Sequence, residues 1–178
     1  MIHAHLDHSA TMRGIQLKQH QWHANLIIEV ASRRQHRAGR DDVEDRSEHF
    51  LGDSHGRDNI TTAKLALDDK GRFIGLDIDI VSDMGAYLSC YAPYIPYLGA
   101  GMASGVYDIA ATHVRVRGVF TNTVPTTPYR SAGRPEAIYV IERLIDLAAD
   151  EHGFDPVVLR RKNFIRPEQM PYTNAVGI

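Results

Sequence analysis

The feature that most constrains the fold is a short turn between two strand-like runs. Residues 60–68 and 72–82 flank the sequence DDKG at 68–71. Two such runs joined by a tight turn are typical of an antiparallel hairpin. In the second run large apolar residues alternate with small or acidic ones, namely Ile74, Leu76, Ile78 and Ile80 with Gly75, Asp77 and Asp79. The alternation predicts a strand with one buried face and one face in water.

Residues 113–120 predict a third strand of the same kind, because valines alternate there with arginines. Between the hairpin and this strand, residues 85–107 hold five tyrosines together with Gly and Pro. This composition favours an irregular crossover that packs on a surface or on a partner.

The clearest helix is predicted from Pro135 to about Glu151. Proline suits the start of a helix, and Glu136 suits the positive end of the helix dipole. Gly153 is expected to end the helix. Its apolar positions form one wide stripe, made of Ile138, Ile141, Ile145 and Ala148 and widened by Val140, Leu144 and Leu147. The width of the stripe predicts that much of the helix circumference is buried.

A second helix is predicted after Asp155, whose side chain suits the N-cap and is followed by Pro156. Together the patterns predict an α+β fold in which antiparallel strands pack against helices. We divide the chain into a divergent leader at residues 1–42, which we expect to be poorly ordered, and a folded domain at residues 43–178.

Length and composition fit one domain of ordinary size, with 178 residues and a formal net charge of −2. Cys90 is the single cysteine, which excludes an internal disulfide and a cysteine-rich metal site. No run approaches the ~20 apolar residues that cross a bilayer, and the opening residues lack the pattern of a secretory signal. We therefore expect a cytoplasmic protein without a membrane partner.

The first 40 residues differ in charge from the rest of the chain. They hold six Lys/Arg against two Asp/Glu, and six of the ten histidines. A basic arm for nucleic acid is one interpretation of such a segment. The other is a poorly ordered leader, which we favour because the only aromatic ring among these residues, apart from histidine, is Trp22. On this interpretation no nucleic-acid partner is expected.

Residues 3–8 read HAHLDH, an HxHxDH pattern that resembles the metal-binding motif of metallo-β-lactamase-fold hydrolases. Three imidazoles and a carboxylate are ligand types that zinc takes. A zinc hydrolase is therefore an alternative function. Against it, only Met1 and Ile2 precede the motif, where that family has a core strand, and no PGH-like segment follows.

The most unusual stretch is residues 121–137, which run from the third strand into the long helix. Three small residues at 131–133 stand directly before the helix, with Arg130 and Arg134 on either side. Small side chains let the backbone approach a ligand, and free N–H groups at a helix start favour an anion or a metal-bound oxygen. The alternative is an ordinary helix start with conventional capping.

Six separate segments, in the same order and spacing, resemble the molybdenum hydroxylases, the family of xanthine dehydrogenase, aldehyde oxidase and carbon monoxide dehydrogenase. They are EDRSEHF at 44–50, HGRD at 55–58, SDMGAY at 82–87, SGVYDI at 104–109, VFTNTVPTTPYRSAGRPEA at 119–137 and DPVVLRRKNFI at 155–165. The resemblance implies part of the first molybdopterin-binding domain of the large subunit. It covers residues 43–178, about three quarters of the chain.

The resemblance also implies a cofactor and its site. In that family a YRxxGxPE turn approaches the molybdenum of a pterin cofactor, here expected in a dinucleotide form. The matching residues are Tyr129, Arg130, Ser131, Ala132, Gly133 and Glu136. No protein side chain need ligate the metal. Iron-sulfur [2Fe-2S] and FAD groups are expected on partner subunits or domains, and a homodimer of the resulting heterotrimer is expected too.

Two departures from the family bear on the substrate. Copper-containing carbon monoxide dehydrogenases carry a cysteine after the YR of this turn, where this chain has Ser131. A copper-containing centre is therefore not expected. Purine oxidisers carry an arginine at the position that aligns with Leu98, which favours an aldehyde or an aromatic heterocycle over a purine.

The resemblance further implies that the catalytic glutamate lies beyond residue 178 and that a glycine-rich cofactor segment precedes residue 44. We therefore expect a piece of a longer subunit, with opening residues scrambled by a frameshift, and we expect this piece to be inactive alone. A non-catalytic remnant or interaction module is the remaining alternative, because a partial domain would expose apolar faces.

Overall fold

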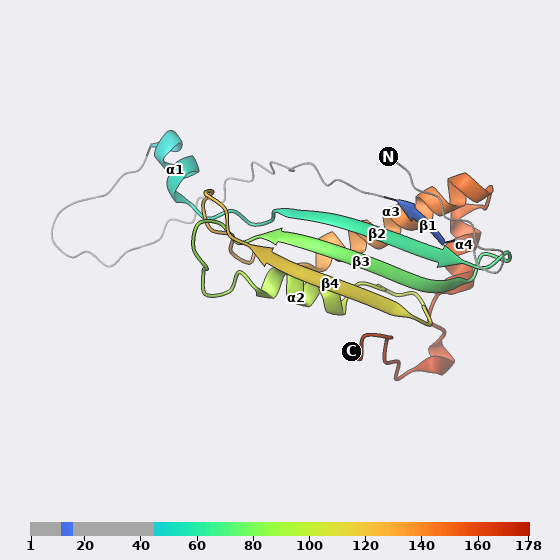
Figure 1. Cartoon of the computed structure of the whole chain (residues 1–178). Helices are drawn as coiled ribbons and strands as arrows, with labels where there is room; N and C mark the ends of the chain where they lie inside the picture. Colours follow the sequence, from blue (N-terminus) through green and yellow to red (C-terminus); the bar gives the residue numbers. More distant parts are fainter. Residues whose placement is uncertain (1–11, 16–44) are drawn as a thin grey trace.

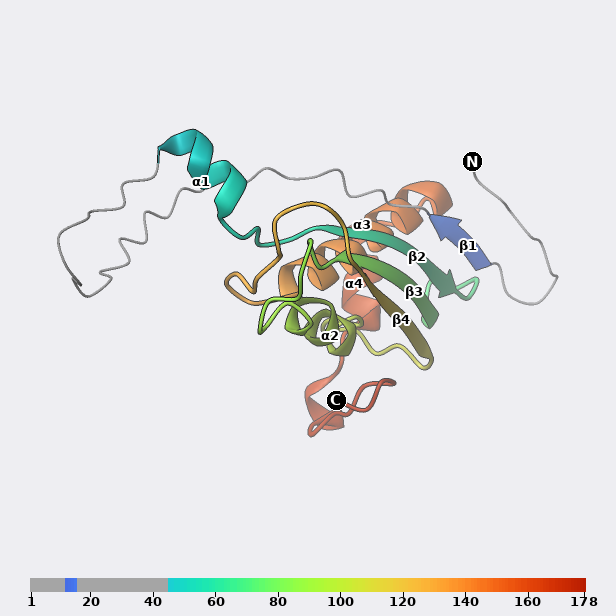
Figure 2. The same ribbon diagram turned by 60° about the vertical axis from the view of Figure 1, so that its left-hand side comes forward.

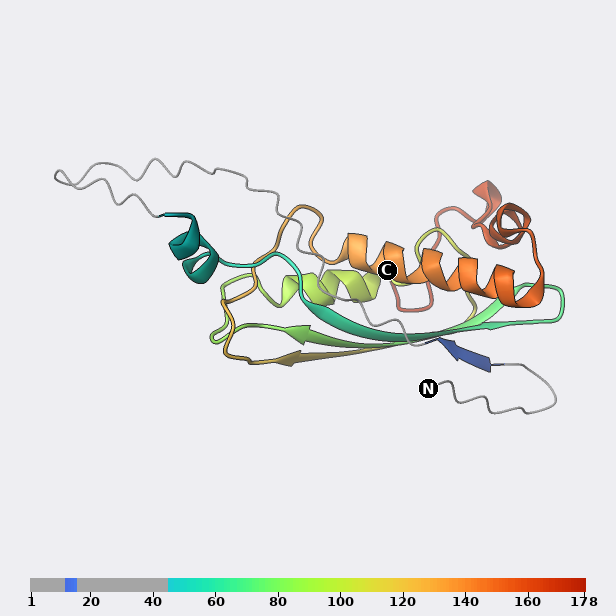
Figure 3. The ribbon, with the colours of Figure 1, turned by 90° about the horizontal axis from the view of Figure 1, so that it is seen from above.

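The computed structural model describes residues 12–15 and 45–178, and these form a four-stranded sheet with helices on one face (Figure 1). The strands are β1 (Met12–Ile15), β2 (Asn59–Leu67), β3 (Phe73–Asp83) and β4 (Thr112–Val119), in that order across the sheet. Figure 3 shows α2 (Tyr94–Gly101) and α3 (Arg134–His152) lying along one face of the sheet, while the other face is open. The predicted α+β class is confirmed.

The predicted hairpin is present, and the sequence DDKG makes its turn. A side-chain oxygen of Asp68 accepts hydrogen bonds from the backbone N–H groups of Lys70 and Arg72 at 2.9 and 2.7 Å. These bonds favour the ionised carboxylate, so they hold the pKa of Asp68 below its usual value. The turn is thus fixed by a local side chain, which explains why the sequence alone indicated it.

One detail of the predicted alternation is wrong, because Ile74 lies on the exposed face of β3 and Phe73 is buried instead. The pairing of β2 with β3 shifts register between Ala66 and Leu67. Such a bulge adds a residue to one strand and reverses which side chains point inward beyond it. From Leu76 to Ile78 the predicted inward face is correct.

The third predicted strand is present as β4, and it pairs with β3 in parallel. Antiparallel pairing holds for β1 with β2 and for β2 with β3, so the expectation that all the strands are antiparallel is wrong for β4. The connection from β3 to β4 must return along the sheet, and it contains α2. The expectation of an irregular crossover missed this helix, because Pro96, Gly99 and Gly101 within it disguise a helical pattern.

Helix α3 begins and ends close to the predicted residues and forms the centre of the core. Val140, Ile141, Leu144 and Ile145 are each 3% exposed or less. They pack with inward residues of the sheet such as Leu65 and Ile78 in one apolar cluster. Gly153 ends the helix in the left-handed conformation, with φ of 70°.

Helix α4 (Pro156–Asn163) begins as predicted. The Asp155 side chain accepts hydrogen bonds from the N–H groups of Val157 and Val158, at 2.9 and 2.8 Å. Arg160 donates to the carboxylates of Glu142 and Asp146 on α3 at 2.8 and 2.7 Å. These contacts join α4 to α3, so the role of Arg160 is structural.

The remaining elements lie toward the ends of the sheet. Helix α1 (Arg46–Gly52) carries a capping box, in which Asp45 and Glu48 each bond the backbone of the other. A short 3-10 turn, η1 (Pro167–Gln169), follows α4. Strand β1 falls within the segment assigned to the leader, whose other residues, including the HxHxDH pattern, lie outside the described residues. The boundary at residue 43 stays a prediction.

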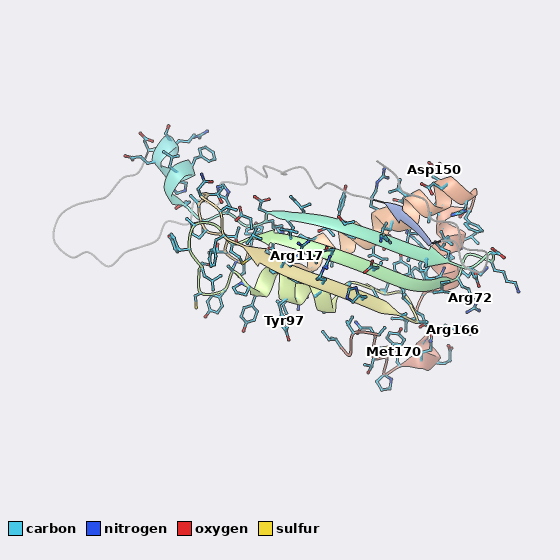
Figure 4. The ribbon with its side chains drawn as sticks, viewed as in Figure 1. Arg72, Tyr97, Arg117, Asp150, Arg166 and Met170 are labelled. Atoms are coloured by element: carbon cyan, nitrogen blue, oxygen red, sulfur yellow. The ribbon has the colours of Figure 1, made fainter. Side chains whose placement is uncertain are left out.

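The open face of the sheet is polar, which explains why no helix of residues 45–178 covers it. Asp79 on β3 pairs with Arg115 and Arg117 on β4, and Asp77 pairs with His113 at 2.8 Å. Figure 4 shows Arg117 over this face and Tyr97 extending from α2. The two arginines hold the pKa of Asp79 below its usual value.

Candidate functional site

The connection between β4 and α3 is bound to the segment that precedes β2. The N–H of His55 donates to the carbonyl of Pro125 at 3.1 Å, and the N–H of Thr127 donates to the carbonyl of His55 at 2.8 Å. The hydroxyls of Ser54 and Thr127 lie 2.8 Å apart. Figure 2 shows both segments at the same end of the sheet. Two stretches about seventy positions apart in the sequence therefore form one site.

The three small residues before α3 form a left-handed turn. Ser131, Ala132 and Gly133 have φ of 74°, 29° and 86°. Only glycine adopts such angles without cost, so two non-glycine residues here mark a strained backbone. Consecutive residues of this kind turn their N–H groups toward one side and create a concavity that suits anions.

Close packing on α2 requires glycine at residue 133. A Cβ at that position would lie 1.8 Å from the carbonyl oxygen of Ile95 and 2.7 Å from the nitrogen of Gly99. A Cβ on Gly99 would in turn lie 3.0 Å from the carbonyl oxygen of Gly133. The turn therefore rests directly on the backbone of α2, and both glycines are needed for that approach.

The turn uses some of its amides internally and leaves others available. Ala132 donates to the carbonyl of Tyr129 at 2.8 Å, and Arg134 donates to the carbonyl of Ser131 at 3.1 Å. Among the described residues, the N–H groups of Ser131 and Gly133 have no hydrogen-bond acceptor. Of the four amides from Ser131 to Arg134, two are thus bonded within the turn and two are not.

Glu136 lies in the first turn of α3, as expected, and its carboxylate is buried and pairs with Arg57. The Glu136 side chain is 8% exposed, and its Oε1 lies 2.8 Å from Nε of Arg57. The Arg57 guanidinium also donates to the carbonyl of Arg130 at 2.7 Å and lies 5.2 Å from the ring centre of Tyr129. Sequence reasoning noted HGRD only as a motif and missed this contact.

The two arginines beside the turn, Arg130 and Arg134, are both exposed. Nη1 of Arg134 donates to the carbonyl of Ser131 at 3.5 Å. Glu136 also lines a small cavity of about 20 Å³ beside Asn59, which is room for one water molecule.

An open pocket of about 390 Å³ lies beside the turn. Its walls are apolar and aromatic, and Ala132 of the turn forms part of them. The rings of Tyr91 and Tyr94 meet edge to face with centres 5.9 Å apart. The residues lining it are Ser89, Cys90, Tyr91, Tyr94, Leu98, Thr127, Pro128 and Ala132. The sequence singled out Leu98, Cys90, the tyrosines of residues 85–107 and the stretch 121–137 separately, because only the folded chain brings them together in one pocket.

Asp58, next to Arg57, has a raised pKa. Partial burial is the main cause, and the nearby carboxylate of Asp83 adds to it, while His55 acts in the opposite direction. A carboxyl whose pKa is higher in the folded than in the unfolded state destabilises the fold once it ionises. The protein therefore loses stability as the pH rises above 3.8, the usual pKa of this group.

We therefore expect Asp58→Asn to stabilise the protein at pH 7, with a gain that shrinks as the pH is lowered toward 4. Urea unfolding at several pH values measures this. Asp69→Asn removes the same charge from the exposed hairpin turn and is the control. A loss of stability at pH 7 in Asp58→Asn alone would contradict the expectation.

Fold and site together define a cofactor-binding domain: a helix-backed sheet with a left-handed turn that offers a backbone amide next to an open, apolar pocket. The chain belongs to the molybdopterin cofactor-binding domain family, whose model matches residues 17–164.

The relatives are subunits of oxidising enzymes. The chain is 40% identical over 140 residues to the carbon monoxide dehydrogenase large chain of Hydrogenophaga pseudoflava. It is 36% identical over 136 residues to 6-hydroxypseudooxynicotine dehydrogenase complex subunit gamma of Paenarthrobacter nicotinovorans. Each match covers 76% of this chain and 17% of the relative. The structure of quinoline 2-oxidoreductase from Pseudomonas putida 86 matches with a TM-score of 0.72 at 36% identity, over 76% of this chain and 18% of that chain. The molybdenum hydroxylase resemblance is confirmed.

The residues at the turn fit an anionic group of a molybdopterin cofactor at one amide. The exposed Ser131 has an N–H group without an acceptor among the described residues, and the next residue of the turn, Ala132, borders the pocket, whereas Gly133 is buried against α2. Across the described part of the chain, no cluster of His, Cys, Asp and Glu could hold a metal ion. In the same residues, no helix combines the length and hydropathy that a membrane crossing requires.

Proposed function

We propose that this chain forms the part of a molybdenum hydroxylase that places a small, apolar substrate beside the cofactor. The observation that carries the proposal is the pocket, whose wall includes Ala132 of the left-handed turn. Family membership favours this function over a zinc hydrolase or a non-catalytic module.

When bound, the molybdenum cofactor supplies a two-electron oxidation that converts a substrate C–H to C–OH with oxygen from water. Ser131, which is exposed, donates its free N–H group to an anionic or oxygen group at the turn. Tyr91, Tyr94 and Leu98 exclude water from the substrate and orient its ring by apolar contact.

The pocket favours an aromatic heterocycle or an aldehyde. None of its lining residues carries a full charge that could pair with a polar purine, and Leu98 stands where purine oxidisers are expected to have arginine. One solved relative is a quinoline 2-oxidoreductase, which is named for such a heterocycle.

The rest of the enzyme would complete the chemistry. The pocket has no carboxylate among its lining residues, so an acid–base group would come from elsewhere, and we propose that this chain alone is inactive. We also propose a dinucleotide cofactor, [2Fe-2S] and FAD on partner subunits or domains, a homodimer of heterotrimers and a cytoplasmic location. The chain spans 17% of its relatives' length, so these concern the whole enzyme.

Cys90 offers a direct test of the pocket, because it is the only cysteine and is exposed on the pocket wall. We expect quinoline to protect this thiol from alkylation by iodoacetamide. At ten times the dissociation constant the rate should fall about tenfold, since a bound ligand blocks the reaction in proportion to occupancy. Hypoxanthine, a purine, should protect much less. Mass spectrometry follows the labelling.

The control moves the thiol out of the pocket. In the double variant Cys90→Ser and Ser47→Cys the thiol lies on the exposed helix α1, and quinoline should not change its rate. Equal protection by quinoline and hypoxanthine, or none by quinoline at saturation of its solubility, would remove the support for the proposed substrate class.

A further inference from the structure

We propose that Arg57 is a positioning residue, which holds the left-handed turn in the shape that meets the cofactor. The importance of that turn rests on the function proposed above. Nothing in the family match assigns this arginine a role; the contacts of its side chain do. It acts through the residues at either end of the turn and touches neither the pocket nor the free amides.

The guanidinium joins the two ends of the turn with two of its nitrogens. Its Nη2 donates to the carbonyl of Arg130, directly before the turn, at 2.7 Å. Its Nε lies 2.8 Å from the carboxylate of Glu136, in the first turn of α3. The bond from Nη2 has a fixed direction, whereas the contact of Nε with Glu136 is a close ion pair without hydrogen-bond geometry. The single ammonium of a lysine cannot make both contacts in the same way.

Burial makes the pair with Glu136 important. The Glu136 side chain is 8% exposed and that of Arg57 is 32% exposed. A charge so far from water is costly unless it is paired, and removing one partner leaves the other charge uncompensated. The Glu136 carboxylate therefore stays beside Arg57. Because Glu136 lies in the first turn of α3, this ion pair also fixes the start of the helix.

The turn itself needs an external restraint. Ser131 and Ala132 both occupy the left-handed region that side chains disfavour, and such residues persist only where surrounding structure holds them. Gly133 is fixed from below by α2. Arg57 supplies a second restraint from the segment before β2. Its guanidinium carbon also lies 5.2 Å from the centre of the Tyr129 ring.

Arg57 is itself well placed to act as a restraint. The preceding residues are joined to the β4–α3 connection by the paired backbone bonds of His55. At Gly56 a Cβ would lie 3.1 Å from Cβ of Tyr129, so the two segments are in close contact. Arg57 thus contacts the turn from a backbone segment that is itself hydrogen-bonded to the β4–α3 connection.

Hydrogen exchange on the full chain without cofactor tests the proposal. The probes are the bonded amides of Ala132, Arg134 and Ala137, whose acceptors are carbonyls in or beside the turn. In Arg57→Met we expect their exchange to speed up about tenfold or more, while amides of β2 and β3 keep their wild-type rates. Arg57→Lys should be intermediate. Arg143→Met removes an exposed arginine from α3 and should match wild type.

A second variant separates positioning from general stability. Adding Glu136→Gln to Arg57→Met removes the unpaired buried charge and should slow the exchange of Ala137 again, while Ala132 stays fast because the bond to the Arg130 carbonyl is still lost. Unchanged exchange in Arg57→Met would overturn the proposal. So would an equal rise across β2 and β3, and if Arg57→Met does not fold, Arg57→Lys gives the same comparison. Because no cofactor or substrate is present, failure here is distinct from failure of the quinoline experiment.

Discussion

Replacing Gly133 with alanine is expected to lower the free energy of unfolding by about 3–5 kcal/mol. The new Cβ would lie 1.8 Å from the carbonyl oxygen of Ile95 in α2, and the backbone there has φ of 86°. Neither backbone can move without breaking the contact between α2 and the start of α3. Urea unfolding followed by circular dichroism measures the change.

Gly153→Ala is a matched control for this prediction. Gly153 also has positive φ, 70°, and a Cβ there would have no heavy atom within 4 Å. Its substitution should therefore cost only the conformational penalty, about 1–2 kcal/mol. If the two variants lose equal stability, the close approach to α2 contributes nothing and the described packing of the turn is wrong.

Replacing Asn163 with aspartate is expected to cost about 3–4 kcal/mol at pH 7, because three buried hydrogen bonds depend on the amide. Its Nδ2 donates to the carbonyls of Gly71 and Leu159 at 2.8 and 2.9 Å, and its Oδ1 accepts from the N–H of Phe73 at 2.9 Å. Aspartate keeps the acceptor but turns a charged oxygen toward two carbonyl oxygens. Urea unfolding measures the loss.

Two comparisons check the cause of this loss. Asn122→Asp makes the same change at an exposed loop position and should alter stability by less than about 0.5 kcal/mol. The deficit of Asn163→Asp should shrink as the pH is lowered, since a protonated carboxyl can again donate to one carbonyl. A deficit independent of pH would point to packing, and the hydrogen-bond account would fail.

Asn163 also explains how α4 is placed. The end of α4 is attached to the turn of the β2–β3 hairpin, about ninety residues earlier in the chain. The sequence marked the hairpin turn and the cap of α4 separately. It contained no indication that one buried amide joins them, since such a bond depends on the three-dimensional path between them.

The sequence by itself determined the features that depend on near neighbours. Asp68 makes the hairpin turn, Asp155 caps α4, and Gly153 ends α3, each through contacts within a few residues. The motifs at 119–137 and elsewhere also sufficed to indicate the family, which the match to residues 17–164 confirmed.

Only the tertiary structure decided what lies around the turn. The parallel pairing of β4, helix α2 beneath Gly133, and Arg57 against Glu136 all join segments far apart in sequence. Side-chain periodicity reports which face of an element is buried, and it carries no information about which distant element buries it. The small residues of the turn could therefore be recognised in the sequence. The direction of their amides, the contacts that hold the turn and the pocket beside it depend on tertiary packing.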